Sequence, residues 1–348
     1  MKKIVLFKPY MSWKARFYAL RVLMGDMIGE GPVVKQFEKE FSERFNLQTY
    51  GVAVNSGTSA LELAYHLAGI GPGTEVITTV LTCTATNIPL LHTGCKIVFS
   101  DIDEDLNVST KDIRQKITPQ TRAIVFTHFG GNNRGLDELL QICDENKITL
   151  IEDAAQAVGS NFWGRADFTA VSFQAIKTLT SVDGGMLICR REEDRLRARK
   201  LRWYGYDRDL KHKTGDTDLM EAGWKKHMSD VTAAIGLGNL RSFNKPYRHR
   251  LKLASVYEQY GIKCHAWLAI GMLNQGSAVS VFRMQMAENG VDVGQHHFRN
   301  DKYTIFKHSK TSLPKMDELE NRYVFFPYHT GVSVKQAHKI GKLFLKYK

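Results

Sequence analysis

The sequence has few cysteines, no long hydrophobic run and no flexible linker. Its 348 residues include only five cysteines, which show neither metal-binding spacing nor a paired disulfide framework. This pattern favours a reducing, cytoplasmic location and gives no indication of a metal site. No apolar segment approaches the roughly 20 residues that cross a bilayer, so we expect no membrane span. Since no Pro/Gly/Ser-rich linker separates its parts, we expect them to pack together.

Acidic residues are outnumbered, which raises the question of an anionic partner. The chain has 48 Lys and Arg against 36 Asp and Glu, for a net charge of +12. Such a surplus suits either nucleic acid or a small phosphorylated ligand. The densest basic run, residues 190–202, is interrupted by acids, which is typical of a solvated helix face. We therefore expect a phosphorylated small molecule and no nucleic acid.

Short β-branched segments alternate with helical segments along the first two thirds of the chain. This alternation predicts an α/β fold with a mostly parallel sheet covered by helices on both faces, and a ligand site beyond the carboxyl ends of the strands. We predict helices at residues 59–68, 110–116 and 136–146. Strands are predicted at residues 76–80, 96–99, 123–127, 149–151, 170–173 and 186–189.

The pattern changes near residue 241, where a long basic helix begins and shorter elements follow. We therefore predict a large domain over residues 1–240 and a smaller α/β domain over residues 241–348. The first 30 or so residues are expected to pack on the small domain. A helix is predicted at residues 334–346, opened by Ser333 and Gln336 at capping-box spacing.

Two of the predicted loops next to strand ends carry groups that suit an anion and a cation. The segment from Asn55 to Leu61 is a small-residue turn that leads into a helix. Its backbone N–H groups and hydroxyls could hold a phosphate, or it could be an ordinary Ser/Thr N-cap. The apolar strand that ends in Glu152 and Asp153 leaves a carboxylate at the carboxyl edge of the sheet. That carboxylate could bind a positive group, or it could cap a helix.

Lys177 lies among apolar, hydroxyl and glycine residues in FQAIKTLTSVDGG, with little opposing charge nearby. Desolvation there would lower the pKa of its amine and make the amine a nucleophile, whereas the alternative is a lysine that reaches solvent. A basic and aromatic loop around Lys225 could meet a phosphate or be plain surface. A phosphate cradle, an Asp and a Lys in this order within a parallel α/β sheet are the groups that a pyridoxal phosphate enzyme needs.

The chain resembles the DegT/StrS-type family of sugar aminotransferases in an ordered set of segments. These are MIGEGP (27–32), SGTSALELA (56–64), GIGPGTEVI (69–77), VFSDID (98–103), IEDAAQAVGS (151–160), SFQAIKTLTSVDGGM (172–186) and MSDVTAAIGL (228–237). The resemblance implies the fold of the aspartate aminotransferases (fold type I), with a seven-stranded, mostly parallel sheet. It also implies a homodimer with shared active sites.

The resemblance assigns roles to individual residues. Lys177 would form the internal aldimine with pyridoxal 5'-phosphate, and Asp153 would pair with the pyridine nitrogen. The remaining cofactor contacts would be Gln156 at the phenolic oxygen, Gly57, Thr58 and Ser172 at the phosphate, Cys83 where the family often has an aromatic residue, and Lys225, from the partner subunit, where the family has Asn. The substrate contacts would be Met27, Ile28, Gly29, Asp183, His297 and Arg299, the histidine and arginine being alternatively parts of a solvated loop.

The implied reaction is a ping-pong transamination that passes through pyridoxamine 5'-phosphate. L-Glutamate would donate the amino group and a nucleotide-diphosphate keto-sugar would accept it, in the synthesis of aminodeoxysugars for a surface polysaccharide or glycan. One rival is a sugar dehydratase of the same fold, which would replace the lysine by histidine, so Lys177 argues against it. The other rival is a non-catalytic, cofactor-binding regulator, which need not keep Lys177, Asp153 and Gln156 together.

Overall fold

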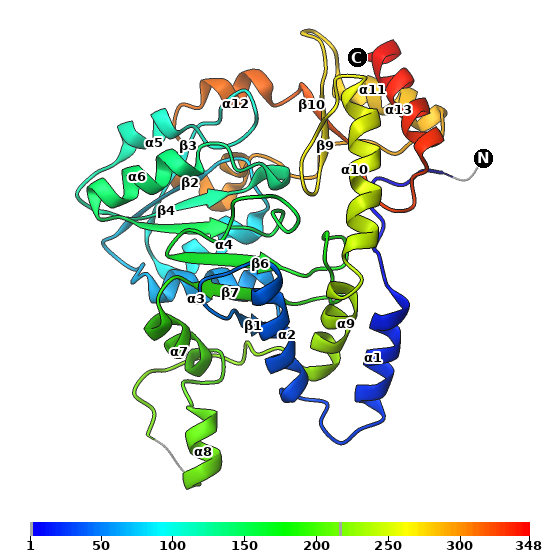
Figure 1. The fold of residues 1–348 in the computed structure, drawn as a ribbon. Helices are drawn as coiled ribbons and strands as arrows, with labels where there is room; N and C mark the ends of the chain where they lie inside the picture. Colours follow the sequence, from blue (N-terminus) through cyan, green and yellow to red (C-terminus); the bar gives the residue numbers. More distant parts are fainter. Residues whose placement is uncertain (1–2, 216–217) are drawn as a thin grey trace.

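The computed structural model describes residues 3–215 and 218–348, and a seven-stranded sheet lies at its centre (Figure 1). The strands occur in the order β1-β7-β6-β5-β4-β2-β3, and β7 alone is antiparallel to its neighbours. They are β1 (Val52–Val54), β2 (Glu75–Thr79), β3 (Lys96–Ser100), β4 (Thr121–Thr127), β5 (Thr149–Asp153), β6 (Phe168–Ser172) and β7 (Gly185–Cys189). The predicted α/β class and mostly parallel sheet are confirmed.

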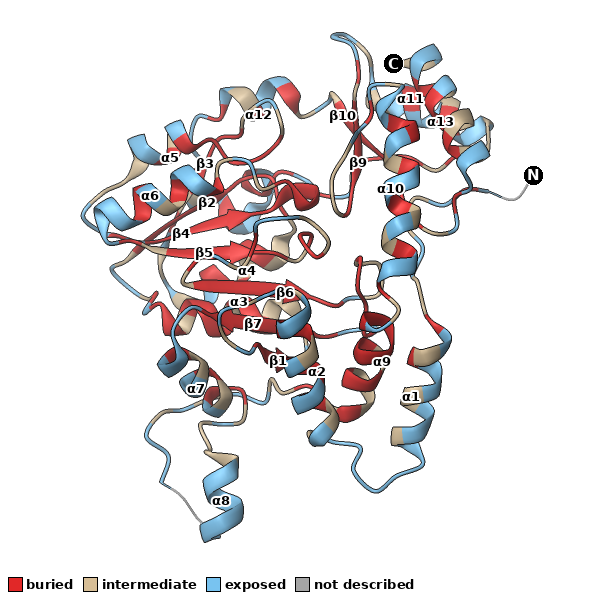
Figure 2. Ribbon diagram, in the orientation of Figure 1, coloured by how far each residue is buried: buried red, intermediate tan, exposed pale blue. Residues whose placement is uncertain are grey.

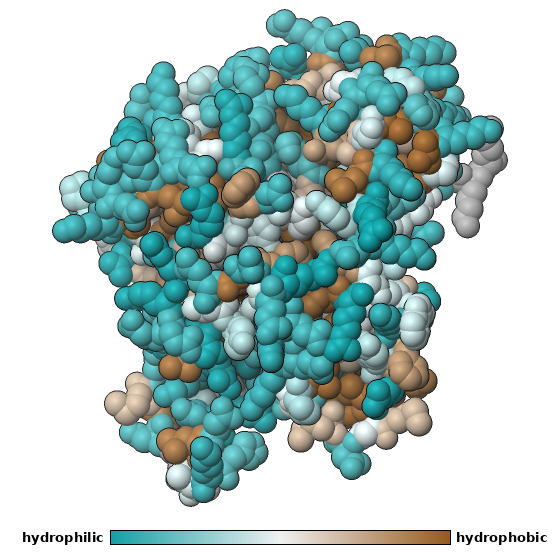
Figure 3. Space-filling model, in the orientation of Figure 1, coloured by the Kyte–Doolittle hydropathy of each residue, from teal (hydrophilic) through white to brown (hydrophobic). Residues whose placement is uncertain are grey.

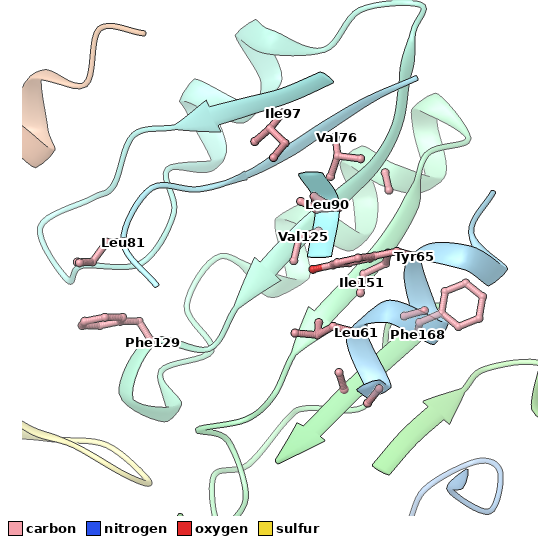
Figure 4. Packing of buried hydrophobic residues seen from close by; sticks show 14 of the residues in the cluster. Leu61, Tyr65, Val76, Leu81, Leu90, Ile97, Val125, Phe129, Ile151 and Phe168 are labelled. Carbon is pink, nitrogen blue, oxygen red and sulfur yellow. The ribbon is translucent and has the colours of Figure 1, made fainter. Parts of the chain in front are cut away.

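Helices cover both faces of this sheet, and Figure 2 shows the strands between them as buried. One face packs on α3 (Gly57–Leu67), α4 (Thr84–Thr93) and α7 (Glu192–Leu201). The other face packs on α2 (Pro32–Arg44), α5 (Thr110–Lys116), α6 (Leu136–Asn146) and α9 (Asp230–Leu240). Figure 4 shows the first of these cores, in which Leu61 and Tyr65 of α3 and Leu90 of α4 lie over Val125, Ile151 and Phe168 of the sheet.

The predicted elements were found with small shifts at their ends, whereas β1 and α4 were not predicted. Helix α1 (Trp13–Leu23) precedes α2. β1 has only three residues, and α4 contains Pro89, which hides the helical pattern. Two short helices, η1 (Phe129–Gly131) and α8 (Arg208–Thr214), complete this part of the chain.

Residues after 241 build a second, smaller sheet of three antiparallel strands in the order β10-β9-β8. Its strands are β8 (Lys263–Cys264), β9 (Ala269–Met272) and β10 (Tyr323–Phe326). The helices of this part are α10 (Asn244–Glu258), α11 (Val279–Glu288), η2 (Asn300–Lys302), η3 (Thr304–Ser309), α12 (Pro314–Leu319) and α13 (Val334–Tyr347), and the capping box of α13 is present as predicted.

The proposed boundary near residue 240 coincides with the break between α9 and α10, but packing crosses it. Ile4 joins the core of the smaller sheet, and Phe306 and Met316 join the core of the large one. Because each half contributes residues to the core of the other, the division into two domains remains a proposal. Within the described residues, no helix is both long enough and apolar enough to cross a membrane.

Helix α1 packs on α9 and leaves an apolar face exposed. Ser12 caps α1, and its hydroxyl also donates to the carbonyl of Gly238 at 3.1 Å. On the outer side, Trp13, Phe17, Leu20, Leu23 and Met24 are between 48% and 80% exposed. In Figure 3 brown and tan atoms gather at the lower right, where Figure 1 places α1.

We expect Gly238→Ala to loosen α1 from α9. A Cβ at Gly238 would lie 2.4 Å from the Cα of Ala15. Because this neighbour is a backbone atom, relieving the clash would require one helix to move away from the other. The free energy of unfolding should fall by about 1–3 kcal/mol, measured by urea denaturation. Gly71→Ala is the control, because its Cβ would meet only a carbonyl oxygen at 4.0 Å. Equal stability of the two variants would contradict this close packing.

Candidate active site

A cavity of about 340 Å³ lies where the carboxyl ends of β5 and β6 meet the start of α3. Its walls come from segments far apart in the sequence, and it gathers most of the predicted site residues. The predicted residues that line it are Gly57, Thr58, Cys83, Asp153, Gln156, Ser172, Lys177, Asp183 and His297.

The first turn of α3 forms one wall. Ser56 caps the helix by accepting a hydrogen bond from the N–H of Ser59 at 3.0 Å, so the N-cap alternative holds here. The N–H groups of Gly57 and Thr58 have no acceptor within residues 3–215 and 218–348. A Cβ at Gly57 would lie 2.7 Å from the Cβ of Ser172, so only glycine lets the helix start this close to β6. The free N–H groups and the positive helix end suit an anion.

Asp153 ends β5 with its carboxylate fixed toward the cavity. It is 5% exposed and accepts hydrogen bonds from the hydroxyl of Thr86 at 2.6 Å and from the N–H of Ala155 at 3.1 Å. Thr86 lies in the first turns of α4, on the same face of the sheet as α3. The cavity thus has one carboxylate whose orientation is set by two donors.

Glu152 points to the opposite face of the sheet, because side chains alternate along a strand. It is fully buried, hydrogen-bonds to His128 at 2.6 Å, and accepts from the N–H groups of Gly164, Arg165 and Ala166. Burial alone would raise the pKa of Glu152, but the bond and charge of His128 and the N–H groups of Ala166 and Arg165 outweigh it and lower the pKa. Glu152 therefore holds together a loop outside the cavity.

Lys177 lines the cavity, in contrast to a lysine that extends into bulk solvent. Burial lowers the pKa of its amine below the usual value, although Asp153 and Cys83 oppose the shift. A lower pKa makes the neutral, nucleophilic amine more available near neutral pH. The turn that carries Lys177 thus presents an amine to the same space as the Asp153 carboxylate.

Gln156 and two histidines form another part of the cavity wall. The Oε1 of Gln156 accepts from the N–H of Gly130 at 2.7 Å, which leaves its amide nitrogen 3.2 Å from the Nε2 of His297. Because the amide can only donate, the Nε2 of His297 must accept, and the imidazole is neutral. Burial and the charges of Lys177 and His296 lower the pKa of His297 well below its usual value, in agreement with that state.

His296 is a cavity residue that the sequence did not single out. Its only signal was its position next to His297. Burial and the charge of Lys177 lower its pKa too. The pair therefore adds two neutral imidazoles to the wall facing Lys177.

Four of the predicted contacts lie away from this cavity. Met27, Ile28 and Gly29 are exposed on the loop between α1 and α2, and Lys225 is exposed on the loop before α9. None of these residues lines the cavity of its own chain. Any role at the site would have to be in the cavity of a second copy.

Arg299 is also absent from the cavity lining and is engaged elsewhere. Its guanidinium pairs with Asp301, Asp317 and Glu320, and the residue is only 5% exposed. Burial opposes its charge, but these carboxylates raise the pKa of Arg299 above its usual value. In this chain Arg299 joins the segments around η2 and α12, which argues against a substrate contact.

Asp183 stands in the cavity lining on a strained turn. Val182 and Gly184, on either side of it, have φ values of 76° and 139°, and its carboxylate accepts from the N–H of Gly184 at 2.9 Å. A β-branched residue such as valine rarely adopts a positive φ. Asp183 therefore lies on an unusual turn in the cavity lining.

The donor set of the cavity fits pyridoxal phosphate. The free N–H groups at the start of α3 suit its phosphate, the Asp153 carboxylate suits a protonated ring nitrogen, and the Lys177 amine suits its aldehyde. Each of these groups would otherwise be a buried or half-buried polar group with an incomplete set of partners. These N–H groups, the carboxylate and the amine are complementary to three different groups of one pyridoxal phosphate molecule.

Comparisons with known proteins point the same way. A model of the DegT/DnrJ/EryC1/StrS aminotransferase family matches residues 14–344. The spore coat polysaccharide biosynthesis protein SpsC of Bacillus subtilis (strain 168) is 37% identical over 242 residues, which cover 66% of this chain but only 62% of SpsC. The crystal structure of AtS13 from Actinomadura melliaura is similar at a TM-score of 0.91, with 30% identity over 99% of each chain. The sugar aminotransferase CalS13 from Micromonospora echinospora has a TM-score of 0.91 and 28% identity, again over 99% of each chain.

The two adjacent acids of β5 lead to a prediction about stability. Glu152→Gln replaces an acceptor by an N–H₂ group that faces N–H donors, so we expect it to lower the free energy of unfolding by about 3 kcal/mol. The exposed Glu288→Gln should have no such effect, as checked by urea denaturation of both variants.

The same variant should also alter the response to acid. The pKa of Glu152 is lower in the folded state than in the unfolded state, where it is about 4.3. The ionised carboxylate therefore stabilises the fold above that pH, and this contribution is lost as the pH falls through the folded-state pKa. Stability measured against pH should therefore fall less steeply on acidification in Glu152→Gln than in the wild type. Parallel curves would contradict the ionised state of Glu152.

Proposed function

Because the chain belongs to the DegT/DnrJ/EryC1/StrS aminotransferase family, we propose that it is a pyridoxal-phosphate-dependent aminotransferase that moves an amino group from L-glutamate to a nucleotide-diphosphate keto-sugar. One observation carries the proposal. The cavity brings the Lys177 amine, the Asp153 carboxylate and the start of α3 to one place, although 120 residues separate Gly57 from Lys177.

The residues of the cavity would divide the work as follows. When bound, pyridoxal phosphate supplies a ring that withdraws electrons from the carbon next to the amino group. Asp153, held by Thr86 and Ala155, keeps a proton on the ring nitrogen. Gly57, Thr58 and Ser172 would hold the phosphate, and Cys83 and Gln156 would contact the rest of the cofactor. Lys177 would hold the cofactor's aldehyde, and its amine, with a lowered pKa, would take a proton from the α-carbon of the amino donor.

The sugar substrate is supported by the lining of the cavity and by the relatives. Asp183 and the neutral His297 offer hydrogen-bonding groups that suit sugar hydroxyls. CalS13 is a sugar aminotransferase, and SpsC serves spore coat polysaccharide biosynthesis. The net charge of +12 would suit the phosphates of an activated sugar. We therefore propose a role in aminosugar synthesis for a polysaccharide or glycan.

We also propose a homodimer in which each copy completes the site of the other. Lys225 and the loop of Met27, Ile28 and Gly29 are exposed and do not line their own cavity. The exposed apolar side of α1, which precedes that loop, is typical of a surface that another chain covers. In the dimer, Lys225 would reach the phosphate of the partner's cofactor, and the Met27 loop would approach the partner's sugar.

Lys177→Ala tests the attachment of the cofactor. We expect the purified protein with pyridoxal phosphate to show a visible absorbance band distinct from that of the free cofactor, and Lys177→Ala to lack it. Lys147→Ala is a control, since Lys147 lies outside the cavity at the end of α6. A band that persists unchanged in Lys177→Ala would exclude this role for Lys177.

The two half-reactions test the donor and the acceptor. Adding L-glutamate should convert the bound cofactor to its pyridoxamine form, and a suitable nucleotide keto-sugar should restore the original spectrum. No conversion by glutamate, with the cofactor firmly bound, would favour a regulator. Deoxygenation of the sugar without net amino transfer would favour the dehydratase.

Asp153→Asn is expected to slow turnover by about 100-fold or more, because the ring nitrogen loses its anionic partner. Glu152→Gln should retain most of its activity at a temperature where it is folded, since Glu152 does not line the cavity. Turnover rates of the two variants compare the acids directly. The reverse order would mean that the wrong acid has been assigned.

A further inference from the structure

Trp267 is a buried residue that touches Lys177 and is held by several parts of the chain. It is 2% exposed. Its indole N–H donates to the carbonyl of Ile176 at 2.9 Å, and its backbone N–H donates to the carbonyl of Gly130 at 2.8 Å. The ring of Phe7 stacks on it with a centroid distance of 5.3 Å and an interplanar angle of 13°. The indole is therefore fixed in both position and orientation.

A buried arginine adds a further restraint on the same segment. Arg250 of α10 is 7% exposed and donates to the carbonyls of Ala266 and Trp267 at 3.3 and 3.2 Å. No carboxylate pairs with it among the described residues, and burial lowers the pKa of Arg250 to about 10. Burying an arginine without a carboxylate partner costs free energy of folding. The two hydrogen bonds that fix the Ala266 and Trp267 carbonyls are therefore kept despite a loss of stability.

The Lys177 amine lies 4.0 Å from the centroid of the indole ring. Within residues 3–215 and 218–348 it has no hydrogen bond and no ion pair. Asp153 acts on it through its charge, and His296 and His297 line the same cavity. The face of a tryptophan attracts a cation, most strongly where water is excluded. The indole thus occupies the place where a buried ammonium usually has a carboxylate.

We propose that Trp267 is a positioning residue for Lys177, whose indole face holds the lysine amine at the wall of the cavity. A carboxylate at this place would bind the ammonium too tightly for the amine to act as a nucleophile. The π face attracts the ammonium more weakly and leaves the neutral amine free to react. Gly130, Phe7 and Arg250 all contact Trp267, so three segments far apart in the sequence hold the indole beside the lysine amine.

The proposal rests on Lys177 being the reactive lysine, and its test needs no turnover. The full chain without cofactor is acetylated competitively at a series of pH values, and mass spectrometry gives the pKa of each lysine from its extent of labelling. Trp267→Leu keeps an apolar side chain but removes the π face. We expect it to lower the pKa of Lys177 by about one unit, since a desolvated cation–π contact has roughly that strength.

Three comparisons make the result specific. Trp267→Phe keeps a π face and should shift the pKa of Lys177 by less than Trp267→Leu does. Phe7→Leu removes the ring that stacks on the indole but keeps the indole itself, and should leave that pKa unchanged. The other lysines of each sample report that the fold is intact, as does its circular dichroism.

Two outcomes would overturn the proposal. If Trp267→Leu folds and labels like the wild type, the indole does not act on the amine. If the pKa of Lys177 rises, the indole only excluded water. Both outcomes differ from a failure of the proposed function, which would appear as an absent cofactor band in a wild-type protein whose Lys177 still responds to Trp267→Leu.

Discussion

The alternation of side chains along β5 is the constraint on which the site depends. Glu152 and Asp153 are adjacent, so the pleat sends them to opposite faces of the sheet. Glu152 closes a buried loop against His128 and three backbone N–H groups, while Asp153 reaches the cavity with two donors fixing it. A slip of one residue in the pairing of β5 would exchange the two acids and disrupt both the core and the site.

The remaining groups of the cavity are brought to Asp153 by the parallel topology. The carboxyl ends of β5 and β6 meet at one edge of the sheet, and α3 begins beside them because Gly57 has no side chain to collide with Ser172. From beyond residue 241, His296 and His297 line the cavity, and the ring of Trp267 lies 4.0 Å from the Lys177 amine. The site therefore exists only when both halves of the chain are docked.

Much of the fold could be predicted from the sequence because its strands and helices have clear periodicity. The residues that the cavity gathers were found where a local pattern, such as the SGTS turn, coincides with a strand end. The assignment of Asp153, and not Glu152, to the site could also be made from the sequence, because alternation along the strand places Ile151 and Asp153 on the same face. Trp267 and His296 were not found, because both meet Lys177 only in the folded chain, across more than 80 residues of sequence. Arg299 was predicted as a substrate contact, with a solvated loop as the alternative, and its carboxylate partners follow from tertiary packing alone.

The proposed function requires Lys177 to form the covalent link to pyridoxal phosphate. The most direct test is to reduce the protein–cofactor complex with borohydride, digest it and locate the pyridoxyl group by mass spectrometry. The account predicts one modified peptide, with the label on Lys177 between Ser172 and Gly185. A label on any other lysine, or its absence from a protein that binds the cofactor, would contradict it.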